Sequence, residues 1–368
     1  MVGLQLLKKH TTETNQVSSE PSDLSSSILG PSFWLSLEPQ LPHDFVVSNT
    51  AWAQDLYLMS HFISQTSMTL TTRHDMLHMW QQLVPMDAVQ YPFLAHGMLS
   101  LAALHLAATD SNKKLQYSLL YHFHQSKAIP DFRQALADQD PQCAGPCFAM
   151  AHLLSAVSFA SISDNAPCGF DGSRSVATLD TMLSLFISVR GLMGITLQLE
   201  EQLLRPPYNI DIRVPEISNA PLPPDLSNQF EKLTHIIHQG VENHDPPIDS
   251  RTTDTIGNSS DSKSPNKGAC LDALFHLEVL QRESLSHERR REGMFASASP
   301  YGEIDDFLLP KWLIKVPDQY VIALREKDPT ALQILVKFAE IAQNVGHRWC
   351  LKNSGSNMIS AIENARLQ

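Results

Sequence analysis

Apolar residues recur at helical spacing along most of the chain. The first such segment, residues 50–65, follows polar residues suited to a helix N-cap and carries Trp52, Leu56, Met59 and Ile63. This pattern predicts the first helix. A shorter amphipathic helix is predicted over residues 73–83, and Pro85 is expected to end it, because proline lacks an N–H and restricts the residue before it.

The most apolar segment is predicted to form the central helix of the fold. Residues 93–108 read FLAHGMLSLAALHLAA and follow Pro92, which suits the first position of a helix. The segment is apolar nearly all round and rich in small residues. We therefore expect a helix that neighbouring elements pack closely on several sides.

Helical patterns continue to the end of the chain. Residues 115–137 predict a long helix with a kink or break near Ile129, since Pro130 falls inside the pattern. Further helices are predicted over residues 148–162, 178–189, 269–291, 317–327, 330–345 and 357–366. The sequence has no run of alternating β-branched residues bounded by hairpin turns. The predicted fold class is all-α, a multi-helix bundle.

Three segments interrupt this pattern. Residues 8–32 are polar and rich in Ser and Thr, so residues 1–47 are predicted to be a disordered linker or tail. Residues 206–224 are dense in proline and predict an extended connector. Residues 238–268 have the composition of a long flexible loop. The predicted organisation is one helical domain over residues 48–366, interrupted by that loop.

Charge and cysteine content restrict the functional classes. The 27 Lys and Arg residues against 39 Asp and Glu give a net charge of −12, which opposes direct binding to DNA. The basic run at residues 287–291 lies among glutamates and is interpreted as a solvated helix face. Five cysteines, an odd number, favour a reducing compartment over a disulfide framework. No signal peptide or membrane span is predicted, because the longest apolar stretch, residues 93–108, is short and broken by His96 and His105.

No residue pattern establishes a catalytic or metal site. His74 and His78 have the spacing of zinc ligands on a helix, but Asp75 replaces the glutamate of that motif and no third ligand follows. Phosphate-binding glycine loops and a GxSxG turn are missing from the sequence. The sequence therefore predicts a non-enzymatic protein with no catalytic residue, metal or cofactor. Cys143 and Cys147 are two candidate zinc ligands without a second pair. His122 and His124 are candidates for a catalytic cluster, but core or surface roles are the favoured interpretation.

The stretch at residues 79–108 resembles a known family. The similarity rests on Trp80, Val84 and Pro85, then Pro92, Phe93 and Leu94, and the run AlaLeuHisLeu at 103–106. Supporting similarities occur at residues 56–62, 120–125, 131–133, 188–191 with Ile195, 331–338 and Trp349. Together they resemble the fungal-specific transcription factor domain, the C-terminal regulatory domain of zinc-cluster transcription factors, in the branch of the sterol uptake control regulators.

The resemblance implies a transcription regulator of the nucleus, with a biosynthetic gene cluster as its expected target and a regulatory, dimerisation or ligand-sensing role for the helical domain. Its implied partners are a second copy of the chain, a DNA-bound transcription factor, and a sterol or other apolar ligand. The implied ligand-pocket residues are Phe186, Met193, Phe338 and Trp349, with ordinary core packing as the alternative interpretation. The resemblance also leaves open a second function, a lipid-binding or small-molecule-binding protein of the cytoplasm.

The zinc cluster of that family is not found in this sequence. Its DNA-binding module needs six cysteines, whereas none occurs before Cys143 in this chain. A second departure is at the C-terminal turn, where the family often carries a further Trp that is missing after Trp349. The resemblance therefore implies no direct DNA binding by this chain alone. A truncated gene model is one explanation that the sequence leaves open.

Overall fold

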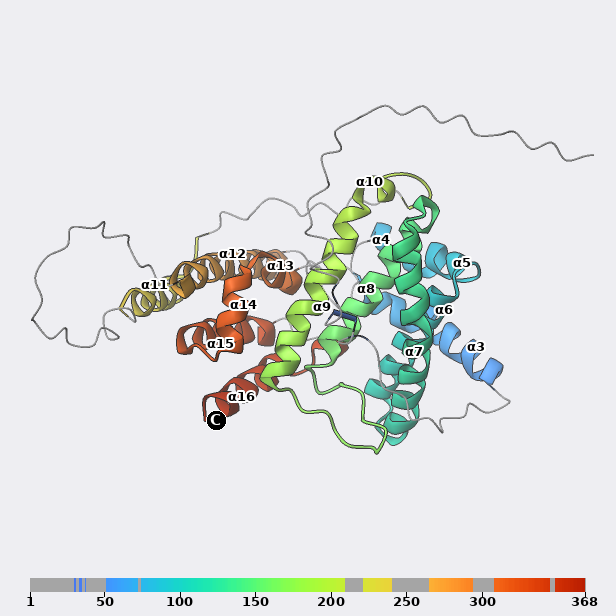
Figure 1. The fold of residues 1–368 in the computed structure, drawn as a ribbon, viewed down its shortest axis with the longest axis horizontal. Coiled ribbons are helices and arrows are strands. Elements are labelled where there is room, and N and C mark those ends of the chain that lie inside the picture. The colour runs from blue at the N-terminus through green and yellow to red at the C-terminus, as the bar shows by residue number, and fades with distance from the viewer. Residues whose placement is uncertain are drawn as a thin grey trace, which may run out of the picture.

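The structure is a computed structural model that describes residues 30, 33–34, 37, 51–71, 74–208, 221–239, 265–293, 308–344 and 348–367. Every regular element in these ranges is a helix (Figure 1). The all-α fold class predicted from the sequence is therefore confirmed.

Helix α6 (Pro92–Thr109) occupies the centre of the first half of the fold. It begins at Pro92, as predicted, and Leu94, Leu101 and Leu104 are fully buried. Its neighbours are α3 (Ala51–His61), α5 (Val84–Ala88), α7 (Lys114–Asp138) and α8 (Ala144–Ala160). Because α6 is apolar nearly all round, these neighbours are needed to cover it.

The first helix buries a different face from the one that its apolar spacing marks. Trp52 is 68% exposed and Leu56 is 62% exposed, whereas Leu58 and Phe62 are fully buried. Helix α3 continues as a π-helical turn, Phe62–Thr66, and a 3-10 turn, Ser67–Thr69. The wider π turn shifts the register of the side chains that follow.

The two proline-based expectations are corrected by the structure. Pro85 lies in the first turn of α5, which continues from α4 (His74–His78) through the π-helical turn Met79–Leu83. The π-helical turn before Pro85 departs from the regular bonding of an α-helix at the point where the proline N–H is missing, and the helix continues through it. Pro130 lies inside α7, which is helical from end to end, so a break near Ile129 does not occur, while the alternative of a kink there stays a prediction.

The other long helices follow in order. The 3-10 turns Ser111–Lys113 and Pro141–Cys143 precede α7 and α8, and α9 (Leu179–Gln198) runs into the short α10 (Glu200–Leu203). The capping box of Thr178 and Thr181 fixes the start of α9. After it come α11 (Pro224–Gln239), α12 (Pro265–Gly293), α13 (Leu308–Lys315), α14 (Asp318–Arg325), α15 (Pro329–Asn344), the 3-10 turn Trp349–Leu351 and α16 (Ser354–Arg366). Helices α10, α11 and α13 were not predicted.

On its C-terminal side, the hydrophobic core is organised around Trp312 on α13. Its indole stacks on Phe338 of α15 at 4.4 Å between centroids, and Phe186 of α9 lies edge-on at 5.7 Å. The indole N–H donates to the carbonyl of Ala273 on α12 at 2.9 Å. On the same side, Arg190 of α9 donates to the carbonyl of Leu313 at 2.8 Å. Apolar packing and these bonds join α9 to the C-terminal helices, which lie together in Figure 1.

Part of the predicted N-terminal tail is packed on the domain. Among the few residues described before residue 51, Phe33 is fully buried and Leu37 is 5% exposed. Gly191 leaves room for the Phe33 ring, and Trp34 lies edge-on to Phe132. The aromatic side chains in an otherwise polar segment account for this difference from the prediction.

The other predicted irregular segments lie largely outside the described residues. Within the predicted loop, α11 extends to Gln239 and α12 begins at Pro265, so both ends of the range 238–268 are helical. Residues 240–264 and most of the predicted connector lie outside the description, as do the side chains of the basic run at 287–291.

Within the part of the chain that the structure describes, three helices are long and apolar enough to cross a membrane by length and composition alone, in contrast to the argument from sequence. They are the segments Pro92–Thr109, Pro141–Ala160 and Leu179–Gln198. The fold buries 72%, 83% and 56% of their most apolar windows, respectively. Burial in the core gives their composition a second explanation, and the expectation of no membrane span stays a prediction.

Replacing Leu101 by Asp is expected to prevent stable folding. The side chain is fully buried in α6, so the change would place an unpaired charge in the core at a cost of several kcal/mol. Soluble yield and far-ultraviolet circular dichroism measure the effect. Leu197→Asp, at a half-exposed position near the end of α9, is the matched control and should stay soluble. A soluble, fully helical Leu101→Asp protein would contradict the placement of α6.

Candidate functional site

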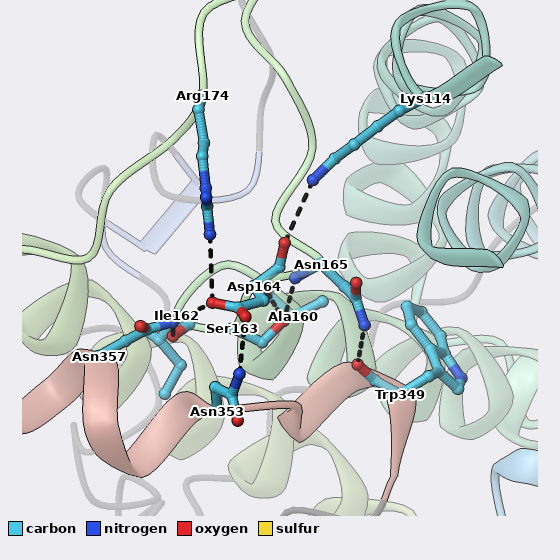
Figure 2. A network of polar contacts seen from close by, with 10 residues as sticks. All are labelled: Lys114, Ala160, Ile162, Ser163, Asp164, Asn165, Arg174, Trp349, Asn353 and Asn357. Atoms are coloured by element: carbon cyan, nitrogen blue, oxygen red, sulfur yellow. Dashed lines mark hydrogen bonds and ion pairs between the residues drawn. The ribbon is translucent and has the colours of Figure 1, made fainter. Parts of the chain in front are cut away.

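A polar junction joins the segment after α8 to the C-terminal segment (Figure 2). Residues 162–165 lie on one side of it and residues 349–357 on the other, and we call these two segments together the Asp164 junction. The two sides are almost two hundred positions apart in the sequence.

The Asp164 carboxylate is the centre of this junction. It accepts hydrogen bonds from the side-chain amides of Asn353 at 2.7 Å and Asn357 at 3.2 Å, and from Arg174 at 3.3 Å. Asn353 stands at the start of α16 with a left-handed backbone, φ 57°, which asparagine tolerates better than most residues. These contacts bind the beginning of α16 to the loop after α8.

Backbone groups of the same loop are also bonded. The Asp164 N–H donates to the carbonyl of Lys352 at 3.0 Å, and the Lys114 ammonium donates to the carbonyl of Asp164 at 3.2 Å. Asn165 donates through its side-chain amide to the carbonyl of Trp349 at 2.6 Å. The loop is therefore held by α7 as well as by the C-terminal segment, as Figure 2 shows.

The junction favours the charged form of its central carboxyl. The hydrogen bond from Asn353 is the largest influence that lowers the pKa of Asp164, and Asn357, Arg174 and Lys352 act in the same direction. Partial burial opposes them by raising it. Because most of its partners are donors, this carboxylate is stabilised as an anion.

Beside the junction, Trp349 closes over a buried histidine of α6. Its indole stacks on the His105 ring with centroids 4.9 Å apart, and its N–H donates to Thr69 Oγ1 at 2.9 Å. His105 Nδ1 lies 3.0 Å from Thr66 Oγ1 and 3.3 Å from His61 Nε2. The C-terminal segment thus reaches the central helix itself.

A second histidine pair connects α6 with α7. His96 Nδ1 lies 3.0 Å from His124 Nδ1, and His124 Nε2 lies 3.4 Å from the Asp55 carboxylate of α3. Burial lowers the pKa of His105 to about 4 and that of His124 to about 3. Both imidazoles are therefore neutral near pH 7, because burial disfavours their charged form and the part-exposed Asp55 carboxylate does not reverse this at His124.

The structure divides the predicted ligand-pocket residues between two places. Phe186 and Phe338 are fully buried and meet at Trp312, whereas Trp349 contacts His105 and Thr69 instead. Met193 is half-buried on α9. Their role as a ligand pocket stays a prediction, and Trp312, the residue that joins two of them, was not among those predicted.

The histidine and cysteine pairs with the spacing of metal ligands or catalytic groups are not gathered into one site. His78 is exposed on α4, and the side chain of His74 lies outside the description. His122 lies with its Nε2 3.1 Å from the carbonyl oxygen of Cys168. Cys143 and Cys147 bring their sulfur atoms within 3.5 Å of one another. Among the described residues, no three His, Cys, Asp or Glu side chains are grouped to hold a metal ion.

The described geometry is that of an all-helical domain in which side-chain contacts, not a catalytic cluster, join distant segments. Residues 57–187 match the family model described as Fungal specific transcription factor domain. This span includes α6, α7, α8 and the Asp164 side of the junction, so the domain expected from the resemblance is confirmed for this part of the chain. The comparison with curated proteins gave no match. The placement in the sterol-regulator branch stays a prediction.

Asp164→Ala is expected to lower the free energy of unfolding by about 1–2 kcal/mol, because three donors lose a partly buried anionic acceptor. Urea unfolding near pH 7 measures the loss. Asp131→Ala, which removes an exposed carboxylate from α7, should change stability much less. Equal effects of the two substitutions would mean that the junction contributes no particular stability.

The buried histidines are expected to make the domain acid-sensitive. A histidine in the unfolded chain has a pKa near 6.5, whereas the two buried histidines have lowered pKa values in the folded state. Below about pH 6.5 the unfolded chain therefore binds more protons than the folded one, and the free energy of unfolding falls as the pH is lowered. Above about pH 6.5 the full stability is present. Each histidine should account for a loss on the order of 1–2 kcal/mol at pH 5. Urea unfolding at pH 7.5 and pH 5 measures this dependence. His124→Asn should reduce it and His78→Asn, at an exposed position, should leave it unchanged; identical profiles for both variants would contradict this account.

Proposed function

We propose that this chain is a regulator of transcription that acts through its helical domain and not by catalysis. The observation that carries the proposal is the match of residues 57–187 to the fungal specific transcription factor domain, which suggests this role. The all-helical architecture fits a domain that works by contact with other molecules. We further propose a nuclear location, since a regulator of transcription acts there.

DNA contact is proposed to come through another molecule. The net charge of −12 opposes the release of counterions that supplies much of the affinity for DNA, and five cysteines are fewer than the six of the family's zinc cluster. A second copy of the chain or a DNA-bound transcription factor would therefore bring it to promoters. Genes of a biosynthetic cluster are the proposed targets, a point that rests on the sequence resemblance alone.

The Asp164 junction is the proposed regulatory element of this domain. It joins the matched segment to Trp349, Asn353 and Asn357, which lie beyond the match. The bonds to the Asp164 carboxylate are polar and partly exposed, so a partner that binds one side could compete for them at low cost in free energy. We propose that opening or closing this junction changes the surface that the domain offers to its partners.

A tethering experiment tests the proposal. The full chain is fused to an unrelated DNA-binding domain in a fungal cell, with a reporter gene downstream of the matching site, and protein level and nuclear location are followed by fluorescence. Tethering should change reporter expression several-fold relative to the DNA-binding domain alone. Asn353→Ala with Asn357→Ala should alter that change, whereas Asn112→Ala, at an exposed position, should not.

A fusion that is stable and nuclear but leaves the reporter unchanged would contradict a role in transcription. The alternative is a lipid-binding or small-molecule-binding protein of the cytoplasm, with Phe186, Met193, Phe338 and Trp349 as its contacts. Native mass spectrometry of the purified chain, combined with imaging of its location in the cell, distinguishes the two, because the alternative requires both a bound apolar molecule and a location in the cytoplasm.

A further inference from the structure

Two thiols lie side by side at the start of α8. Cys143 is the last residue of the 3-10 turn Pro141–Cys143 and the N-cap of α8, and Cys147 lies one helical turn further on. Their sulfur atoms are 3.5 Å apart, and both side chains are buried. The pair lies apart from the Asp164 junction, at the opposite end of the same helix.

The two thiols differ in acidity. The hydrogen bond with Cys147 lowers the pKa of the Cys143 thiol, while burial and the carboxylates of Asp140, Asp87 and Asp138 oppose this effect. The same bond raises the pKa of Cys147. The N-terminal end of a helix also favours a thiolate at Cys143. One thiol is thus suited to attack an oxidant, and its neighbour is suited to react with the product.

An aromatic ring covers this turn. The ring of Tyr208 lies so close to Gly145 that a Cβ atom there would stand 2.0 Å from it. The Tyr208 hydroxyl donates to the Asp87 carboxylate at the end of α5, and the Tyr91 hydroxyl lies 3.4 Å from the carbonyl of Gln142. A change in the first turn of α8 would therefore be transmitted to Tyr208.

We propose that Cys143 and Cys147 form a reversible oxidation site for a hydroperoxide. The Cys143 thiolate attacks one peroxide oxygen, the O–O bond breaks, and an alcohol or water leaves after taking up a proton, which makes Cys143 a sulfenic acid. The Cys147 thiol then attacks that sulfur, the S–O bond breaks, and water leaves with the thiol proton. The peroxide is reduced by two electrons, and the two thiols are oxidised to one disulfide.

Bond formation requires movement of the turn. A disulfide has an S–S length of about 2.05 Å, so the sulfur atoms must approach from their present 3.5 Å. Two cysteines four apart at a helix start do not reach that geometry without distortion of the first turn, which Tyr208 contacts at Gly145. A strained disulfide is readily reduced, so a dithiol reductant should restore both thiols.

Cys168 provides an internal comparison, because it is half-buried whereas the other four cysteines are buried. If exposure alone decided reactivity, Cys168 would be oxidised first. If proximity and acidity decide it, the Cys143–Cys147 pair reacts first. The two expectations are opposite, so one measurement separates them.

The test is a hydrogen peroxide titration of the full chain, followed by alkylation of the remaining thiols, proteolysis and mass spectrometry. The peptide with Cys143 and Cys147 should lose two hydrogen atoms at peroxide concentrations that leave Cys168 reduced, and dithiothreitol should restore it. Cys147→Ser should instead give a sulfenic acid at Cys143 that dimedone traps. Cys143→Ser should leave Cys147 unreactive, and circular dichroism checks that both variants are folded.

Oxidation of Cys168 before the pair would overturn the proposal, as would a peptide that keeps both hydrogen atoms or a disulfide between two chains. A folded Cys143→Ser protein whose Cys147 reacts as readily as the native pair would overturn it as well. None of these outcomes depends on a role in transcription, so the oxidation site and the proposed function are tested separately.

Discussion

The burial of α6 on all its sides is the constraint on which the first half of the structure depends. A helix that is apolar nearly all round has no face that water can cover, so α3, α5, α7 and α8 must enclose it. Close approach needs small residues, and a Cβ atom at Gly97 would lie 2.4 Å from the Met150 sulfur of α8. The arrangement of these helices follows from the need to enclose α6.

The few polar residues of α6 determine which partners enclose it and in what register. Two of them contact α7: Ser100 donates to Gln125 at 2.9 Å, and His96 pairs with His124. Further along α6, His105 contacts Thr66 and is covered by the Trp349 indole. A buried polar group without a partner costs free energy, so a shifted α7 or a displaced Trp349 would be unfavourable even where apolar packing tolerated it.

Sequence periodicity was sufficient for the existence and type of most long helices, because burial imposes a repeating pattern on each of them. It failed where local geometry departs from the ideal helix. In α3 the apolar spacing of Trp52 and Leu56 does not mark the face that Leu58 buries, and the helix continues past Pro85 by way of the π turn Met79–Leu83. Short helices such as α13 carry too few repeats to be recognised, although Trp312 on α13 organises the C-terminal side of the hydrophobic core.

The candidate site was beyond the reach of sequence reasoning for a different reason. Asp164 and Asn353 are 189 positions apart, and neither residue type in isolation indicates a contact. Only the fold brings them together. By contrast, Cys143 and Cys147 are neighbours on one helix turn, so their spacing was visible, but the covering Tyr208 comes from a distant segment.

The two attachments of the C-terminal half differ in their physical character. Around Trp312 the contact with α9 is aromatic and fully buried, and such burial is expensive to undo. At the Asp164 junction the contact combines buried apolar residues such as Leu351 with polar bonds to Asp164. The Asp164 side chain is 26% exposed, so water can replace its polar partners when they separate. The polar bonds of the junction therefore cost less to break than the buried aromatic contacts around Trp312. Because Trp349 covers His105 beside the junction, movement of the C-terminal segment there would also reach the central helix, which connects this segment to the packing of the whole first half.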